Sequence, residues 1–191
     1  MKIAIVGGGI SGLATYLFLV RELPSHDYVI YEAYETPRKK IRGSGTADSD
    51  AQLIGGGIGV APNGMKVLRD LDPKIHADIV AQGFPTARIQ FKNSRGWILG
   101  AMPTVDTKGK DPEAMIMTSR QGVWEILRDR VPDDVFHHVA IAKVEDGPDG
   151  KPVITHRGGD KEAFDLVIGA DGVRSVVRVA ILGDEHAAYY T

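Results

Sequence analysis

The sequence contains no cysteine, and this absence excludes several kinds of chemistry. Without thiols the chain forms no disulfide, no thiolate metal site and no redox-active thiol pair. Two neighbouring histidines, His137 and His138, have no carboxylate or histidine partner at ligand spacing, so we expect no metal site. A cysteine-free sequence fits a reducing compartment, and we expect a cytoplasmic protein.

Long apolar runs and a strong charge of either sign are also missing. No stretch approaches the roughly 20 apolar residues of a membrane-spanning helix, and glycines interrupt the apolar N-terminal run, which argues against a signal peptide. The formal net charge of −2 gives no reason to expect nucleic acid or an anionic membrane as a partner. The 191 residues, of which 43% are hydrophobic, are enough for a buried core.

Glycine, by contrast, is abundant, and its first cluster lies at residues 7–12. The short apolar run at residues 3–6 predicts a buried parallel strand, and residues 13–19 predict a helix that Pro24 ends. Within the cluster, the glycines at positions 7, 9 and 12 fit the G-x-G-x-x-G spacing of dinucleotide-binding loops. The order of strand, glycine loop and helix is the context in which that spacing is meaningful.

Each of these glycines has a physical reason. Gly7 lets the chain turn out of the strand, Gly9 lets the backbone approach a pyrophosphate, and Gly12 lets helix and strand pack closely. The helix N-terminus offers free N–H groups and a partial positive charge to the phosphates. A second predicted strand, residues 28–31, ends in Glu32, whose carboxylate suits a ribose 2′-hydroxyl and would repel a 2′-phosphate. A glycine-rich turn without a ligand is the alternative, but the agreement of these features favours a dinucleotide site.

A second glycine-rich stretch, residues 55–64, follows a polar loop at residues 33–53. Consecutive glycines such as Gly56 and Gly57 let a backbone run flat against a planar ligand while their N–H groups stay free to donate. An ordinary loop that leads into a helix explains the same residues equally well. After this stretch, an apolar pattern predicts a helix that ends at Pro73.

Two arginines are candidates for a binding role. Arg42 lies in the polar loop at residues 33–53, where an arginine would suit a flavin or nicotinamide phosphate. Arg120 lies at the start of a helix predicted at residues 123–131 and capped by residues 118–119, where the helix dipole disfavours a cation. A residue placed against local preference is a candidate for binding, although an exposed surface arginine is the ordinary alternative.

Antiparallel strands are predicted in two places. Residues 87–91 and 97–100 flank a glycine-containing turn and predict a β-hairpin, which in a nucleotide fold usually belongs to a layer that closes over a substrate. Farther along, residues 139–144, 152–155 and 164–168 predict a three-stranded meander.

The last part of the chain carries a third glycine signal. The strand that ends the predicted meander runs into residues 169–172, Gly-Ala-Asp-Gly, and then into a helix at residues 176–182. Asp171 is placed to reach a ribityl or ribose hydroxyl, and Arg178 to pair with a carboxylate or a phosphate. A plain strand–turn–helix in which Asp171 caps the helix is the alternative.

Together these segments resemble the N-terminal portion of the FAD-dependent aromatic hydroxylases, the single-component flavoprotein monooxygenases related to salicylate and para-hydroxybenzoate hydroxylase. Four motifs in the family's order carry the resemblance: residues 7–12 with Glu32, residues 54–64, Arg120 with its helix, and residues 170–178. They match an ADP-binding fingerprint, an I-G-A-G-I-x-L-x-P-N-A stretch, an R-x-x-L helix and an A-D-G-x-x-S-x-x-R motif. The family's third fingerprint, glycine-aspartate followed by small residues and histidine, has no match here.

The resemblance implies an α/β protein with a Rossmann-like FAD-binding fold, made of a parallel sheet, a β-meander crossover and part of an antiparallel substrate-domain sheet. It implies FAD as cofactor, NADPH or NADH as reductant, and O₂ with an aromatic or similar electron-rich small molecule as substrates. The residues implied in cofactor binding are Gly7, Gly9, Ser11 and Gly12 at the pyrophosphate, Glu32 at the adenosine ribose, Gly56, Gly57 and Arg120 on the flavin side, and Asp171 with its neighbour Gly172 at the ribityl chain or pyrophosphate. The family shares no single catalytic side chain across its substrates, so we nominate none.

The missing fingerprint leads to further expectations. We expect an incomplete FAD-binding domain at residues 1–80 and 103–191, with residues 81–102 as an inserted and also incomplete part of the substrate-binding domain. We expect the 191-residue chain to be a fragment of a longer enzyme and to be inactive alone. Two alternatives stay open, namely another FAD-dependent oxidoreductase and a non-catalytic nucleotide-binding fragment.

Overall fold

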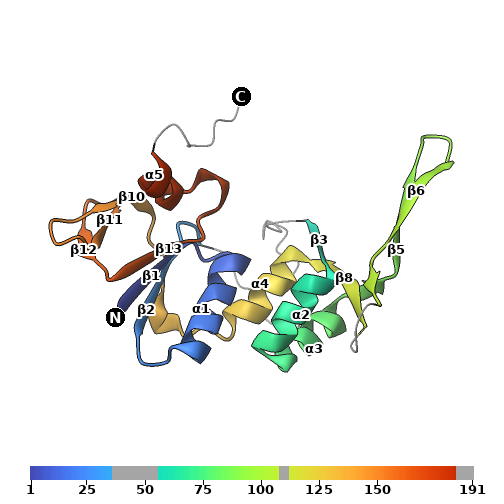
Figure 1. Cartoon of the computed structure of the whole chain (residues 1–191), viewed down its shortest axis with the longest axis horizontal. Helices are drawn as coiled ribbons and strands as arrows, with labels where there is room; N and C mark the ends of the chain where they lie inside the picture. Colours follow the sequence, from blue (N-terminus) through green and yellow to red (C-terminus); the bar gives the residue numbers. More distant parts are fainter. Residues whose placement is uncertain (36–55, 108–111, 184–191) are drawn as a thin grey trace, which may run out of the picture. The chain divides into compact units, whose positions relative to one another are not determined.

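The computed structural model describes residues 1–35, 56–107 and 112–183, which form two compact units (Figure 1). The first unit combines Met1–Ile41 with Leu127–Thr191, and the second is Arg42–Ile126. The division at residues 80 and 102 that the sequence suggested concerns the domains of a complete enzyme and stays a prediction.

The first unit is built on a four-stranded, all-parallel sheet. Its strands, in the order β13-β1-β2-β9, are β1 (Lys2–Val6), β2 (Asp27–Tyr31), β9 (Phe136–His137) and β13 (Leu166–Gly169). The parallel pairs β1–β13, β1–β2 and β2–β9 confirm the predicted parallel sheet. The strand β9 was not predicted, because two residues are too few to show an apolar pattern.

A helix and a meander cover the two faces of this sheet (Figure 1). Helix α1 (Ile10–Glu22) contacts β1 and β2 and buries Leu13 and Tyr16. On the other side lies the antiparallel meander of β10 (Ile141–Asp146), β11 (Pro152–His156) and β12 (Lys161–Ala163). Because side chains alternate along a strand, β1 buries residues on both faces, as expected of a covered parallel strand.

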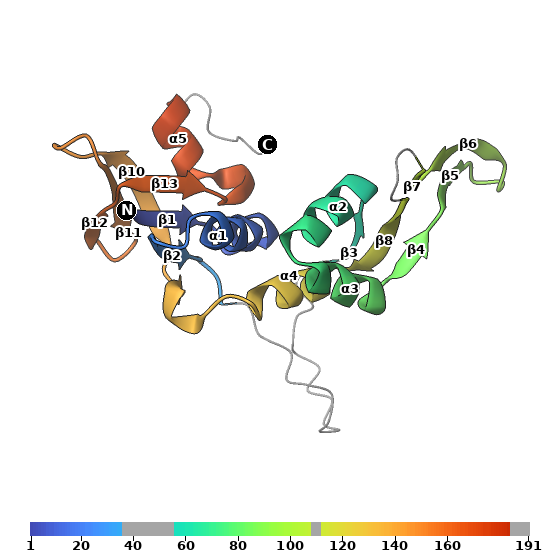
Figure 2. The same cartoon turned by 60° about the horizontal axis from the view of Figure 1, so that its bottom comes forward.

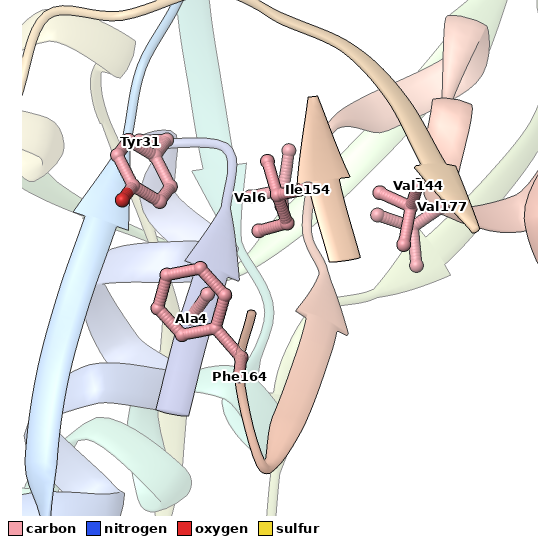
Figure 3. Packing of buried hydrophobic residues seen from close by; sticks show 7 residues of the cluster. All are labelled: Ala4, Val6, Tyr31, Val144, Ile154, Phe164 and Val177. Carbon is pink, nitrogen blue, oxygen red and sulfur yellow. The ribbon is translucent and has the colours of Figure 1, made fainter. Parts of the chain in front are cut away.

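The core between the sheet and the meander is a single apolar cluster (Figure 3). Its buried members are Ala4, Val6, Tyr31, Val144, Ile154, Phe164 and Val177. The last of these comes from helix α5 (Val176–Leu182), which therefore packs on the same cluster. Phe164 is 1% exposed, and burying a side chain of this kind contributes about 1.5–3 kcal/mol.

The predicted meander needs one correction. Its third strand is Lys161–Ala163, whereas Leu166–Gly169, which we assigned to the meander, pairs with β1 in the parallel sheet. The apolar run of β13 suits a strand covered on both faces, while the short polar β12 gives no comparable signal. The first meander strand also begins at Ile141, two residues later than predicted.

The second unit has short strands, all paired antiparallel, with two helices on them (Figure 2). Around β8 (Glu113–Ser119) lie β3 (Gly57–Val60), β4 (Phe84–Thr86) and β7 (Val105–Asp106), each paired to it. Helices α2 (Pro62–Leu71) and α3 (Pro73–Gln82) both contact β8. Pro73 ends the first helix as predicted, but it also begins the second, which the Asp72 carboxylate caps at the N–H of Lys74, 2.8 Å away.

The predicted hairpin is present as β5 (Arg88–Lys92) and β6 (Ile98–Pro103). At its turn, the Asn93 side chain accepts the N–H groups of Arg95 and Trp97 at 3.0 and 2.9 Å, and Gly96 adopts a φ of 83°. These contacts explain why the polar segment between the two apolar runs turns where it does. Its place in a layer over a substrate stays a prediction.

The remaining elements are short. Helix α4 (Arg120–Arg128) begins and ends three residues before the predicted range, because the Ser119 hydroxyl accepts the N–H of Gly122 at 2.9 Å and so fixes the helix start. Two 3₁₀ turns, η1 (Asp133–Val135) and η2 (Gly172–Arg174), complete the described chain. Among the residues that the structure describes, no helix has the length and apolarity needed to cross a membrane.

Candidate functional site

The carboxyl ends of three neighbouring strands meet at one edge of the parallel sheet. The N–H of Gly7 donates to the Tyr31 carbonyl of β2 at 2.8 Å, and the N–H of Ala170 donates to the Val6 carbonyl of β1 at 2.7 Å. The glycine loop after β1, Glu32 after β2 and Asp171 after β13 therefore lie at the same edge. In open α/β sheets this edge is the usual place of a ligand site.

Three glycines of the loop meet three different environments. Gly7 has a φ of +107°, and a Cβ atom there would lie 2.3 Å from the Ala170 carbonyl oxygen. At Gly12 a Cβ would lie 1.9 Å from the Gly7 carbonyl oxygen, so helix and loop touch at this point. At Gly9 a Cβ would meet nothing within 4 Å. The fold therefore requires glycine at positions 7 and 12, whereas Gly9 leaves an open approach to the backbone.

The N-terminus of α1 is left open toward the same edge. Its N-cap, Gly9, makes no side-chain hydrogen bond, and no acidic residue lies in the first turn. Within the described ranges, the N–H groups of Ile10, Ser11 and Gly12 have no acceptor, and the Ser11 side chain is exposed. Such a helix end carries a partial positive charge that suits an anion.

Glu32 is tied to the glycine loop itself, a contact that the sequence did not predict. One carboxylate oxygen accepts the N–H of Gly8 at 2.7 Å, and the other accepts the N–H of Tyr34 at 3.0 Å. A carboxylate has about four acceptor positions, so capacity for ribose hydroxyls is left. Glu32 therefore orders the loop in addition to being the candidate ribose ligand.

Asp171 caps a helix in this structure. Its carboxylate accepts the Ser175 hydroxyl at 2.5 Å and the N–H groups of Val176 and Val177 at 2.7 and 3.3 Å. The capping alternative that the sequence left open is therefore realised in part, because Asp171 accepts the first N–H groups of α5 while Ser175 is the N-cap residue. The predicted contact of Asp171 with a cofactor stays a prediction. Gly172 next to it has a φ of +73°, which favours glycine at this turn.

Three predicted residues of the second unit also lie together. The N–H of Arg120 donates to the Gly56 carbonyl at 3.1 Å, and Gly57 pairs with Ser119 across β3 and β8. The Arg120 side chain is exposed and has no hydrogen-bond or ion-pair partner among residues 1–35, 56–107 and 112–183. The motif from the second glycine stretch and the motif of α4 therefore meet at one sheet edge. Gly55 and Arg42 lie outside the described residues.

Sequence reasoning missed the role of Gly8. It lies inside the glycine cluster, but the spacing that we used skips it. In the structure its N–H binds Glu32, and a Cβ on Gly8 would lie 2.5 Å from the ring of Phe136 in β9. One feature of the sequence could have indicated that position 8 requires glycine, namely that Gly8 stands between two other glycines, Gly7 and Gly9.

Comparison with known proteins shows which proteins this chain is similar to. No protein-family model matches the chain. The 6-hydroxynicotinate 3-monooxygenase of Pseudomonas fluorescens is 32% identical over 195 residues, covering 98% of this chain and 45% of that protein. The FAD-dependent monooxygenase sor5 of Hypocrea jecorina is 28% identical over 200 residues, covering 98% of this chain and 37% of that protein. The chain is a relative of the FAD-dependent monooxygenases.

A solved structure agrees with this relation at the level of the fold. Klebsiella pneumoniae HpxO, crystallised with FAD and uric acid, matches with a TM-score of 0.67 at 23% identity, over 94% of this chain and 41% of that one. The resemblance to FAD-dependent aromatic hydroxylases and the α/β fold class that the sequence predicted are confirmed. The chain spans less than half the length of each of these three proteins.

Proposed function

We propose that this chain is the FAD-binding part of a flavin- and NAD(P)H-dependent monooxygenase that hydroxylates an aromatic or similarly electron-rich small molecule. The observation that carries the proposal is the meeting of the glycine loop, the open N-terminus of α1 and Glu32 at one sheet edge. The sequence relation to named monooxygenases supports the reaction class.

The residues of the first unit fit the adenosine half of FAD. Gly9 and the N-terminus of α1, with Ser11, would receive the pyrophosphate, because both offer N–H groups without a side chain or an acid in the way. Gly7 and Gly12 would hold the loop in the required form, and Glu32 would accept hydrogen bonds from the adenosine ribose.

The residues of the other two motifs would serve the rest of the cofactor. Gly56, Gly57 and Arg120 are proposed on the flavin side, where Arg120 brings a positive charge without a partner among the described residues. Asp171 and Gly172 are proposed at the ribityl chain or pyrophosphate. Asp171 would bind the cofactor and still accept the N–H groups of α5, because each of its carboxylate oxygens can accept more than one hydrogen bond.

The cofactor and the protein residues would have separate roles. Bound FAD would supply the redox chemistry, with NADPH or NADH as reductant and O₂ as the source of the oxygen atom. This chain's residues would bind and orient it, and a cytoplasmic location is proposed from the cysteine-free sequence.

The test is product formation. Protein expressed from its complete reading frame is supplied with FAD, NADPH or NADH, ¹⁸O₂ and a panel of hydroxylated aromatic and heteroaromatic acids. We expect one product that carries a single ¹⁸O atom, detected by mass spectrometry. A flavin that is reduced and then releases hydrogen peroxide, with no oxygenated product across the panel, would instead favour an FAD-dependent oxidase. A flavin that is reduced without peroxide release would favour a dehydrogenase, and absence of flavin binding would favour a non-catalytic nucleotide-binding module.

A further inference from the structure

An aromatic ring from the edge strand β9 closes over the glycine loop of the first unit. Phe136 is 5% exposed and is paired with Ile30 of β2. A Cβ atom on Gly8 would lie 2.5 Å from Cζ and 2.7 Å from Cε2 of this ring, closer than real Cβ atoms come. The φ of Gly8 is not positive. The ring, rather than the backbone conformation, therefore requires glycine at this position.

A buried cation holds the ring in place. Arg128 is 5% exposed, and its guanidinium carbon lies 4.2 Å from the Phe136 ring centroid, within cation–π range. Its Nη1 donates to the Val131 carbonyl and its Nη2 to the Asp133 carboxylate, both at 2.7 Å. A buried guanidinium that is fixed by two such bonds is costly to move, so the ring above it has little freedom.

Gly8 also contacts Glu32. The Gly8 N–H donates to the Glu32 carboxylate at 2.7 Å, and a Cβ on Gly8 would also lie 2.9 Å from the Glu32 Cβ. The Phe136 ring and the Glu32 carboxylate thus confine one peptide of the loop between two neighbouring strands. A shift of that peptide would move the Gly9 backbone next to it.

We propose that Phe136 and Arg128 are positioning residues for the dinucleotide loop. Arg128 fixes the Phe136 ring, the ring fixes the Gly8 peptide, and that peptide meets Glu32 and leaves Gly9 open. The ligand part of the inference rests on the proposed function, whereas the coupling between Phe136 and Gly8 requires no ligand.

A double-mutant cycle tests the coupling. Leucine at position 136 lacks the Cζ and Cε2 atoms that a Cβ on Gly8 would strike, so Phe136→Leu removes the two closest clashes of Gly8→Ala and leaves the approach to the Glu32 Cβ at 2.9 Å. We expect Gly8→Ala alone to weaken FAD binding about tenfold or more, and to weaken it less than about threefold in the Phe136→Leu background. The urea midpoint of unfolding should show the same non-additivity. If Gly8→Ala alone does not fold, recovery of folding by Phe136→Leu is the same result.

Matched controls separate positioning from general packing. Phe164 is a phenylalanine of the same unit, 1% exposed, so Phe164→Leu combined with Gly8→Ala should give additive effects. Arg128→Lys keeps the charge but not the planar group, and we expect a folded protein with several-fold weaker FAD binding.

Two outcomes are decisive. Additive effects of Gly8→Ala and Phe136→Leu on both stability and FAD affinity would overturn the inference. Non-additive stability in a protein that binds no FAD, wild type included, would support the positioning of the loop and refute the proposed function.

Discussion

At the residue scale, the glycines of the first loop differ in what demands them. Gly7 needs a left-handed backbone, whereas Gly8 and Gly12 have no room for a Cβ atom. Gly9 has neither constraint within the described structure, since a Cβ there would meet nothing within 4 Å. The glycine that the fold does not require is therefore the one whose missing side chain is best explained by a ligand.

Because of this difference, we expect alanine at position 7 to lower stability and alanine at position 9 to weaken FAD binding instead. Gly7→Ala should lower the free energy of unfolding by about 2 kcal/mol or more, because it strains a φ of +107° and strikes the Ala170 carbonyl. Gly9→Ala should change that free energy by less than about 1 kcal/mol and yet weaken FAD binding. Urea unfolding and FAD titration of both variants check this. Equal stability loss in the two variants would contradict the assignment.

Glu32 carries the second prediction at this scale. Glu32→Ala removes the ribose acceptor and the partner of the Gly8 N–H, so FAD affinity should fall about tenfold to a hundredfold. The neighbouring exposed Glu35→Ala is the matched control and should leave FAD affinity unchanged. Fluorescence quenching of FAD measures both variants. Unchanged affinity in Glu32→Ala would refute its role at the ribose.

Contacts between distant residues were beyond sequence reasoning. The glycine spacing and Glu32 were predictable because the pattern is local and has a stated mechanism. The link from Glu32 to Gly8 and the ring of Phe136 over Gly8 were not, because they depend on which strands become neighbours. The capping by Asp171 was available as an alternative, but the sequence could not choose between a cap and a cofactor contact.

At the element scale, long apolar patterns were predicted well and short strands were not. Strands β1 and β2 begin one residue before the expected ranges, and the hairpin strands β5 and β6 begin one residue after them. Helix α1 is present but extends three residues beyond the predicted range at each end. Strands β9 and β12 have two and three residues, too few to show a period. Because β12 was missed, the apolar β13 was placed in the meander instead of the parallel sheet.

A polar link joins the sheet to the meander and predicts a pH dependence. Glu162 of β12 accepts hydrogen bonds from Lys2 of β1 and Tyr31 of β2, each at 2.5 Å. The hydrogen bond from Lys2, and next that from Tyr31, hold the pKa of Glu162 below its usual range. Burial, aided by the bond to Glu162, raises the pKa of the Tyr31 hydroxyl.

The sign of the effect follows from the lowered pKa. A carboxylate with a lower pKa in the folded chain than in the unfolded chain stabilises the fold above the unfolded value and loses this contribution as the pH falls. We expect the urea midpoint to decrease as the pH drops below about 4, and to decrease less steeply in Glu162→Gln. Lysine partners also lower the pKa values of Glu145 and Asp165. The Glu162→Gln variant should therefore keep part of the decrease of the urea midpoint with falling pH. An identical slope in Glu162→Gln would refute this role of the link.

At the scale of the whole molecule, the four motifs predicted the α/β fold class and the resemblance to FAD-dependent aromatic hydroxylases, and both are confirmed. The chain spans less than half the length of the relatives that it matches, so the substrate and the reaction of the whole protein are proposals. Within each unit, predicted motif residues lie together: the glycine loop with Glu32 in the first, and Gly56 with Arg120 in the second.

A visible absorption spectrum shows whether the β1–α1 loop is part of an FAD site. Protein expressed from its complete reading frame is soaked with FAD, freed of unbound cofactor by gel filtration and scanned. We expect a yellow protein with flavin bands, and loss of these bands in Glu32→Ala but not in Glu35→Ala. A folded wild-type protein that emerges colourless would contradict an FAD site at the β1–α1 loop.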